Sequence, residues 1–303
     1  MIRVIQQRKI WFIFSSVLVG ASIVVVAIFG LKPGIDFTGG ALTELGFEAG
    51  RPSLEEMQSA MEDLGFEGFT VQPAGEDDYI IRTKPLTEEE RLSLVQGIRG
   101  QFEGEIREDR FESIGPTIGK ELREKSVYAI ITVLVAIVLY VAFAFRKVSG
   151  QLSSWKLGVT AIAALVHDVV VTLGVFALLG YFLNVEVDTL FVTALLMVLG
   201  YSVNDTIVVF DKIRQNIVAA STSNFERVVE TSVNQTVVRS LNTSVTTLFV
   251  LLALFFLGGE SLKWFVMALI VGVVVGTYSS IFLASPLLVA WQRMTHRNRG
   301  SNS

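Results

Sequence analysis

An acidic side chain interrupts a long apolar stretch of this sequence. The stretch is "LGYSVNDTIVVFDKIRQN", residues 199–216. Asn204 and Asp205 follow residues typical of a membrane-spanning helix, and the polar segment that would leave the membrane begins only at Asp211. A charged side chain in the middle of a bilayer costs about 2.5–3.5 kcal/mol on insertion scales. An unpaired carboxylate at this depth is therefore unfavourable, and reversible proton binding is the chemistry that such a residue can perform.

Arg239 is the predicted partner of Asp205. It opens "VVRSLNTSVTTLF", residues 237–249, and its long side chain can extend inward from a helix end. Burial favours the neutral carboxyl group and an approaching guanidinium favours the charged one, so relative movement of the two helices would load and unload a proton. The hydrogen-bonding side chains expected at the same level are Ser202, Asn204, Asn242 and Thr243.

These residues also have structural interpretations. Asp205 can be a helix-packing contact, and Arg239 can be a basic anchor at a cytoplasmic helix end. A second polar pair, His167 and Asp168, interrupts "AIAALVHDVVVTLG" about eleven residues into another apolar run, which places it near the midplane of a bilayer. A functional site and hydrogen bonds to adjacent helices are equally open for this pair.

No metal or cofactor is expected. The chain has 2 histidines, His167 and His296, and no cysteine, and no cluster of acidic residues completes a ligand set. The absence of cysteine also means that no disulfide stabilises any part of the chain.

Six apolar runs must position these polar residues. Hydrophobic residues make up 51% of the chain and charged residues only 18%, which is typical of an integral membrane protein. The runs lie at residues 10–31, 126–145, 157–180, 187–210, 241–257 and 264–290, and each is close to the roughly 20 residues that a spanning helix needs. The first run is longer than the apolar part of a signal peptide and lacks a small-residue cleavage site, which favours an uncleaved anchor. The pattern "FERVVETSVNQTVVRS", residues 225–240, suggests a separate helix along the membrane surface.

Basic residues predict the orientation. Short cytoplasmic segments of membrane proteins are enriched in Lys and Arg. The basic residues that gather on one side of the predicted spans are Arg3, Arg8, Lys9, Arg146, Lys147, Lys156, Lys212, Arg214, Arg227, Arg239, Arg293, Arg297 and Arg299. We therefore expect both termini in the cytoplasm, a first segment at residues 1–31, an extracytoplasmic domain at 32–125, five further spans within 126–290 and a cytoplasmic tail at 291–303.

The extracytoplasmic segment has the pattern of a small α+β domain. Strand-like stretches begin near residues 41, 68, 79 and 104, and helix-like stretches follow possible caps at Ser53 and Thr87. The order βαββαβ predicts a ferredoxin-like fold. Residues 32–125 contain 11 Lys or Arg against 21 Asp or Glu, a charge of −10, which excludes a nucleic-acid partner. The segment has no catalytic motif, so a contact domain is expected and not an enzyme.

Four motifs resemble the SecF family, the smaller membrane subunits of the bacterial SecDF protein-export complex. They are "GIDFTGG" at 34–40, "IGPTIGKEL" at 114–122, "VHDVV" at 166–170 and "GYSVNDTIVVFDKIRQN" at 200–216. A glycine-rich turn such as "FTGG" alone is weak, and its simplest physical interpretation is a flexible join between a helix and the outer domain. The four motifs occur in order around six spans, so the resemblance covers essentially the whole chain.

The resemblance implies a resistance-nodulation-division type fold in the inner membrane, paired with a SecD-like subunit. It implies assistance to the SecYEG-type translocon on exported, unfolded polypeptides, driven by the proton gradient. It also implicates Asp205 and Arg239 in proton conduction, with Asn204, Asn242 and Thr243 around them. The resemblance supports a role for Asp168 less strongly. The alternatives are half of a proton-driven exporter of small molecules or lipids, and a passive scaffold for translocon assembly.

Overall fold

The computed structural model describes residues 2–145, 154–219 and 224–300, the last of them, 295–300, by their backbone alone. Arg146 and Lys147 lie outside the described residues, and the side chains of His296, Arg297 and Arg299 are not described. The described chain divides into two compact units. The helical unit comprises residues 2–32, 128–185 and 190–300, and the sheet unit comprises Pro33–Val127 and Glu186–Thr189.

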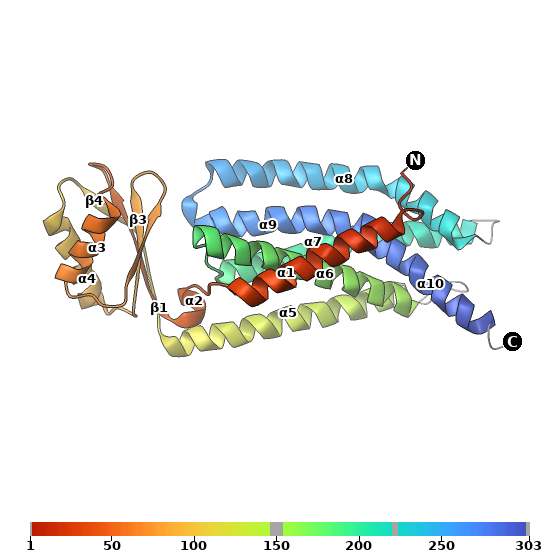
Figure 1. Ribbon diagram of the computed structural model, residues 1–303, viewed down its shortest axis with the longest axis horizontal. Coiled ribbons are helices and arrows are strands. Elements are labelled where there is room, and N and C mark those ends of the chain that lie inside the picture. The colour runs from red at the N-terminus through yellow and green to blue at the C-terminus, as the bar shows by residue number, and fades with distance from the viewer. Residues whose placement is uncertain (1, 146–153, 220–223, 301–303) are drawn as a thin grey trace. The chain divides into compact units, whose positions relative to one another are not determined.

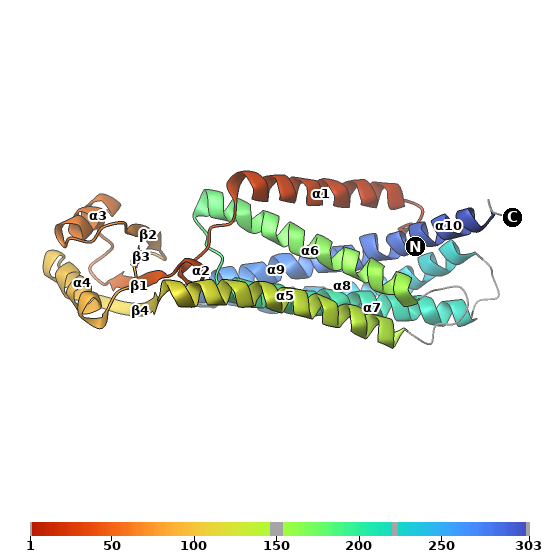
Figure 2. The ribbon, with the colours of Figure 1, turned by 90° about the horizontal axis from the view of Figure 1, so that it is seen from below.

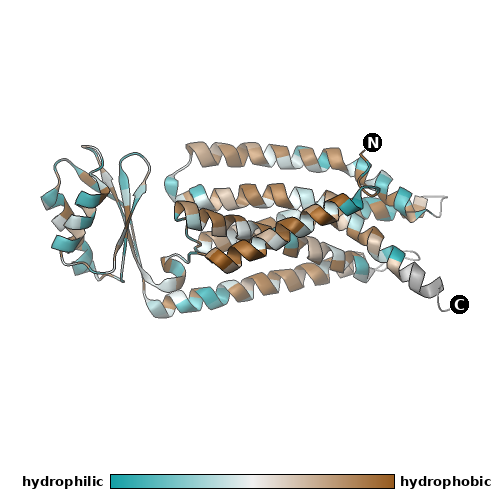
Figure 3. Cartoon of the chain, viewed as in Figure 1, coloured by the Kyte–Doolittle hydropathy of each residue, from teal (hydrophilic) through white to brown (hydrophobic). Residues whose placement is uncertain are grey.

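Six long helices confirm the six predicted spans. Within the described residues, six helices are long and apolar enough to cross a membrane. They are α1 (Arg8–Phe29), α5 (Pro116–Ala144), α6 (Ser154–Leu183), α7 (Thr189–Ala219), α8 (Phe225–Leu257) and a final helix made of α9 (Glu260–Ser279), the π-helical turn η1 (Ser280–Ala284) and α10 (Ser285–Gly300). Apolar residues make up most of the length of each helix (Figure 3). The chain is therefore a polytopic membrane protein.

The prediction of a separate surface helix at residues 225–240 is wrong. These residues form the first half of α8, which continues to Leu257 without a break. No glycine or proline interrupts the helix, so nothing in the sequence stops propagation from Phe225. Asn224 caps the start, because its side chain accepts a hydrogen bond from the amide of Arg227.

Small residues, Gly272 and Gly276 among them, bring helices of the helical unit into close contact. A Cβ atom added at Gly272 would lie 2.1 Å from Val198, and one at Gly276 would lie 2.9 Å from Ser202. Glycine at these positions lets α9 approach α7 closely. α1 lies along α6 in the same way, and there Gly174 lets the two helices meet (Figure 2).

The sheet unit has the predicted βαββαβ order. Its strands are β1 (Gly40–Phe47), β2 (Thr70–Ala74), β3 (Asp78–Thr83) and β4 (Ile106–Ile114), and its helices are α3 (Leu54–Asp63) and α4 (Glu88–Gln101). The antiparallel sheet has the strand order β2-β3-β1-β4, and both helices cover one face of it (Figure 1). Leu45, Met57, Ile81 and Leu94 lie in the core between sheet and helices. Burial of this core stabilises the unit, which has no cysteine.

Capping boxes begin α3 and α4, at the caps predicted at Ser53 and Thr87. Thr87 accepts a hydrogen bond from the amide of Glu90, and the Glu90 carboxylate accepts one from the amide of Thr87. Ser53 and Glu56 make the same pair of bonds at α3. Bonds from Thr87 lower the pKa of Glu90, so this cap is intact at neutral pH and weakens as pH falls through the carboxyl range.

Thr87→Ala is expected to destabilise α4 by about 1 kcal/mol, because the hydroxyl cap is lost. Hydrogen exchange of the first-turn amides of α4 would then be roughly fivefold faster in the full-length protein. Thr83→Ala is the control, because the Thr83 hydroxyl bonds only to the carbonyl of Lys84 and caps no helix. Equal exchange in the two variants would contradict the role of Thr87.

The "GIDFTGG" motif forms a short helix and a glycine turn in the sheet unit. It contains the short helix α2 (Ile35–Thr38), followed by Gly39 and Gly40 with φ of 75° and 144°. A Cβ atom at Gly39 would lie 2.9 Å from the backbone of Pro116, and one at Gly40 would lie 2.9 Å from a carbonyl oxygen of β3. Close approach and left-handed backbone explain why glycine occupies both positions, and the flexible join stays a prediction.

The same motif holds the segment that precedes α7. The amide of Gly34 donates to the carbonyl of Val187 at 2.8 Å. Asp36 accepts hydrogen bonds from the amide of Thr189, at 2.8 Å, and from its hydroxyl. Asp36 thus caps the first residue of α7 from a distant part of the sequence.

Candidate functional site

Asp205 lies in the core of the helical unit. It is 8% exposed, and its Oδ1 accepts a hydrogen bond from the hydroxyl of Ser240 on α8 at 2.8 Å. Its Oδ2 is buried and has no hydrogen-bond partner among the described residues. The carboxyl group therefore has one oxygen held by a neighbouring helix and one free to take a proton or a new partner.

Arg239 does not contact Asp205 in this structure. The two side chains make no ion pair within 4.0 Å among the described residues, but Arg239 lies near enough to act on the carboxyl group electrostatically, while the hydrogen bond to it comes from Ser240. Arg239 is exposed on α8, one residue before Ser240, so successive helix positions point in different directions.

The other predicted polar residues also face outward. Asn204 on α7 and Asn242 and Thr243 on α8 are exposed, and the Thr243 hydroxyl donates to the carbonyl of Arg239 at 3.0 Å. Polar side chains at membrane depth are unfavourable against lipid and normally face protein or water. The structure thus separates the predicted cluster into a buried carboxyl group and an exposed polar surface, made of Asn204, Arg239, Asn242 and Thr243.

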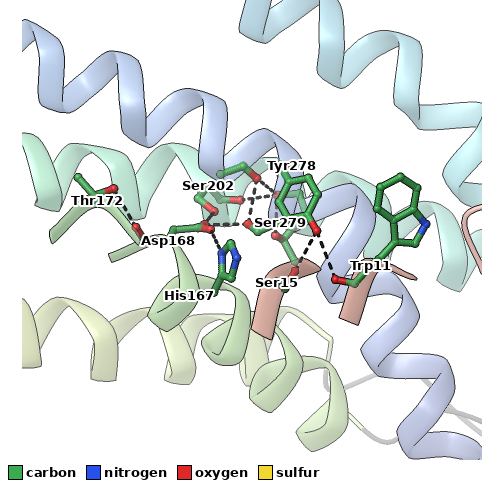
Figure 4. Close-up of polar contacts among 11 residues, drawn as sticks. Trp11, Ser15, His167, Asp168, Thr172, Ser202, Tyr278 and Ser279 are labelled. Atoms are coloured by element: carbon green, nitrogen blue, oxygen red, sulfur yellow. Dashed lines mark hydrogen bonds and ion pairs between the residues drawn. The ribbon is translucent and has the colours of Figure 1, made fainter. Parts of the chain in front are cut away.

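His167 and Asp168 form the more extensive polar centre (Figure 4). Asp168 is 0% exposed, and its Oδ1 lies 3.0 Å from Nδ1 of His167. Its Oδ2 accepts hydrogen bonds from Ser202 on α7 at 2.5 Å and from Ser279 on α9 at 2.8 Å. Ser202 was expected beside Asp205, but the structure places its hydroxyl on Asp168.

Hydroxyl groups, most of them buried, lie along the helix contacts near Asp168 and Asp205. Ser202 and Asp205 are three residues apart on α7, which is about 4.5 Å along the helix axis. Other hydroxyls bond across the α7, α8 and α9 contacts, and we call this set the hydroxyl seam: Tyr201, Ser202, Thr206, Ser240, Ser244, Thr277, Ser279 and Ser280. Within it, Thr206 lies 3.0 Å from Ser280, and Tyr201 donates to Ser244 at 3.0 Å.

Sequence reasoning missed Ser240 and Ser279, although a signal for the first was present. Hydroxyl residues recur every four positions on α8, at Ser232, Thr236, Ser240 and Ser244, and all four are buried. A spacing of four places them on one helix face. Ser279 had no comparable signal, because the sequence of α9 alone does not show which neighbouring helix its serines contact.

An open groove with a volume of about 540 Å³ lies beside His167. Its lining comes mainly from α1 and α6, with two leucines from η1 and α10: Phe12, Ser15, Ser16, Val19, Gly20, Ala163, Val166, His167, Leu283 and Leu287. The hydroxyl of Ser15 lies 2.9 Å from that of Tyr278, whose ring lies 5.9 Å from the His167 imidazole. His167 thus connects the groove to the buried Asp168.

Comparisons with known proteins agree with this architecture. The family described as protein export membrane protein SecD/SecF, C-terminal, matches residues 95–294, and the SecD/SecF GG motif matches residues 24–50. The protein translocase subunit SecF of Thermobaculum terrenum is 42% identical over 305 residues, which cover 96% of this chain and 94% of the relative. The SecF subunit of Anaerolinea thermophila is 37% identical over 98% of this chain and 96% of the relative.

A solved structure has the same fold. The crystal structure of SecDF, a translocon-associated membrane protein from Thermus thermophilus, aligns with a TM-score of 0.84 and 35% identity over 96% of this chain. This chain spans 39% of that SecDF chain. Sequence motifs, six spans, the sheet unit and these relatives agree: the chain belongs to the SecF family of protein-export membrane proteins.

Proposed function

We propose that the chain is the SecF subunit of a complex with a SecD-like subunit in a bacterial inner membrane. The complex assists a SecYEG-type translocon by using the proton motive force to move its extracytoplasmic domains against an exported, unfolded polypeptide. The names of the relatives support the translocase assignment. The similar SecDF protein is described as translocon-associated and is a longer chain than this one, which supports a SecD-like partner.

The orientation belongs to the same proposal. Both termini lie in the cytoplasm, and residues 32–125 lie outside. The basic residues Arg3, Arg8 and Lys9 before α1 support it, because they would stay on the cytoplasmic side. Residues 126–290 complete the membrane domain, and 291–303 form a cytoplasmic tail.

The observation that carries the proposal is the half-satisfied carboxyl group of Asp205. One oxygen bonds to Ser240, and the other is buried and without a hydrogen-bond partner among the described residues. A buried carboxyl group in this state binds a proton readily, and a cation that approaches displaces the proton. Arg239, one residue from Ser240 on α8, is the basic residue that reaches it when α7 and α8 shift.

The exposed polar surface supports the partner. Asn204, Arg239, Asn242 and Thr243 are exposed at the level of α7 and α8 where lipid would leave their polar groups unsatisfied. A second subunit that packs on this surface supplies hydrogen-bonding groups and a further acid for a complete proton path. Transporters commonly place such sites at the interface of two repeats.

The energy that one proton provides limits the mechanism. One charge that crosses 100 mV provides about 2.3 kcal/mol, whereas inversion of a 1:99 population needs about 5.5 kcal/mol. One movement of the outer domains therefore requires more than one proton, or a substantial pH gradient. The work is mechanical and makes no covalent bond, so the reaction needs no cofactor.

Arg239→Ala tests the proposal in vesicles that contain the complex with its SecD-like subunit. Proton flux driven by an imposed potential is expected to fall by more than tenfold, because no cation is left to displace the proton from Asp205. Arg227→Ala is the matched control, since Arg227 is an exposed arginine near the start of the same helix. Unchanged flux in Arg239→Ala would reject the exchange at Asp205.

The alternatives give different results in the same assay. A proton-driven exporter would move a small molecule or lipid without the translocon. A passive scaffold would show no proton flux in the unmodified complex and would still support export. Failure of the purified chain to associate with a SecD-like subunit would reject the export assignment.

A further inference from the structure

We propose that His167 and Asp168 form a second proton-binding centre, which exchanges protons with Asp205 through the hydroxyl seam. The inference rests on the proposed proton coupling and gives this pair a role beyond holding helices together. Three features carry it: the tautomer that Asp168 imposes on His167, the groove beside His167, and the hydroxyls between the two carboxyl groups.

Asp168 decides which imidazole nitrogen carries hydrogen. Its Oδ2 already accepts hydrogen bonds from Ser202 and Ser279, and its Oδ1 lies 3.0 Å from Nδ1 of His167. A carboxylate only accepts hydrogen bonds, so we assign the hydrogen to Nδ1. In this neutral tautomer Nε2 carries a lone pair.

Nε2 of His167 is buried and has no hydrogen-bond partner among the described residues. The residue is 4% exposed, so bulk water does not satisfy this nitrogen. A proton that binds at Nε2 produces an imidazolium whose other nitrogen contacts the Asp168 carboxylate, and the opposite charge stabilises it. The pair therefore has an acceptor ready for one proton.

The groove lies beside His167, although Nε2 itself is buried. His167 lines it together with the hydroxyls of Ser15 and Ser16 from α1, which can hold water at its wall. None of the residues that line the groove except His167 is titratable, so no cation there repels an incoming proton.

Few other ionisable groups face the pair. α9 contributes Tyr278, whose ring lies 5.9 Å from the imidazole, and α7 contributes Asp205, one turn beyond Ser202. α1 contributes the hydroxyls of Ser15 and Ser16, and η1 and α10 contribute the apolar Leu283 and Leu287. Among the described residues, Asp205 is thus the nearest acid along the seam that could take a proton onward.

The hydroxyl seam leads from one acid toward the other. Ser202 bonds to Asp168, and the Ser280 hydroxyl lies 3.0 Å from Thr206 but meets Ser202 at its backbone carbonyl, at 3.3 Å. At the far end Ser240 holds Asp205. The hydroxyl-to-hydroxyl bonds therefore do not form one unbroken row, and a proton taken up at His167 reaches Asp205 only when hydroxyls rotate or a water bridges the gap.

A magnetic-resonance titration of the reconstituted complex tests the centre directly. In a His296→Gln background, His167 is the only histidine of this chain, which has 2, so selective labelling of this subunit's histidine gives one imidazole signal. We expect the neutral form to carry hydrogen on Nδ1, and Nε2 to gain a proton as the pH is lowered. An imidazole that stays neutral at every pH at which the complex is intact, or that carries hydrogen on Nε2 when neutral, would overturn the proposal.

Proton flux gives the second test. His167→Gln, which keeps a polar side chain but does not titrate, is expected to lower flux by about tenfold in the assembled complex. Thr160→Val is the matched control, because among the described residues this buried hydroxyl on α6 bonds only within its own helix and lies outside the seam. If Asp205→Asn abolishes flux and His167→Gln leaves it unchanged, this inference fails and the proposed function stands. If the unmodified complex conducts no protons, the proposed function fails, and the titration still decides whether the centre binds a proton. If His167→Gln does not assemble, the titration alone decides.

Discussion

Asp205→Asn is expected to abolish the stimulation of export by the proton gradient and to reduce proton flux by about 10²-fold or more, the range associated with losing a positioned proton-transfer group. Asparagine has the same shape as aspartate, and its amide oxygen can still accept the hydrogen bond from Ser240. The amide does not take up a proton, so the substitution removes the chemistry and keeps the contact. The measurement is flux in vesicles together with export at matched protein levels.

Asp211→Asn is the control for this experiment. Asp211 lies on the same helix, and its side chain is partly exposed and pairs with Arg214 at 2.8 Å. An exposed pair of this kind contributes about 0–1 kcal/mol, so flux and export are expected to remain normal. Normal gradient-dependent export in Asp205→Asn would instead favour a passive scaffold.

Gly174→Ala is expected to disrupt the contact between α1 and α6. A Cβ atom at this position would lie 2.4 Å from the Cβ and 2.7 Å from the Cα of Ser22, and a backbone atom cannot rotate away. Overpacking of this kind costs about 1–3 kcal/mol, so the expected result is a lower thermal midpoint and a lower yield of assembled complex. The same shift would change the groove beside His167.

Gly158→Ala is the matched control on the same helix. A Cβ atom there would meet no atom within 4 Å. Both substitutions gain about 1 kcal/mol of helix propensity, so their difference isolates the steric term. A thermal midpoint for Gly174→Ala equal to that of Gly158→Ala would show that α1 moves aside at little cost.

Local signals in the sequence predicted the elements well. Apolar length predicted six helices, and the capping residues Ser53 and Thr87 predicted where α3 and α4 begin. These features depend on residues within a few positions of each other. The prediction of a surface helix at 225–240 was wrong, because amphipathic spacing alone does not show where a helix ends.

The partners of the polar residues were harder to predict. Reasoning from sequence found Asp205, His167 and Asp168 because acids and imidazoles are rare in apolar runs. It paired Asp205 with Arg239, whereas the structure shows Ser240, its neighbour in sequence. Serine is inconspicuous in a membrane helix, and its role depends on how one helix is rotated against the next. That rotation is set by packing of the whole unit and not by any single segment.

The cap that Asp36 places on Thr189 ties a distant part of the sequence to α7. Thr189 is the first residue of this 31-residue helix, and Asp205 lies sixteen positions further along it, about 24 Å along the helix axis. A substitution at Asp36 would therefore remove a cap from the same helix that carries the candidate proton-binding carboxyl group.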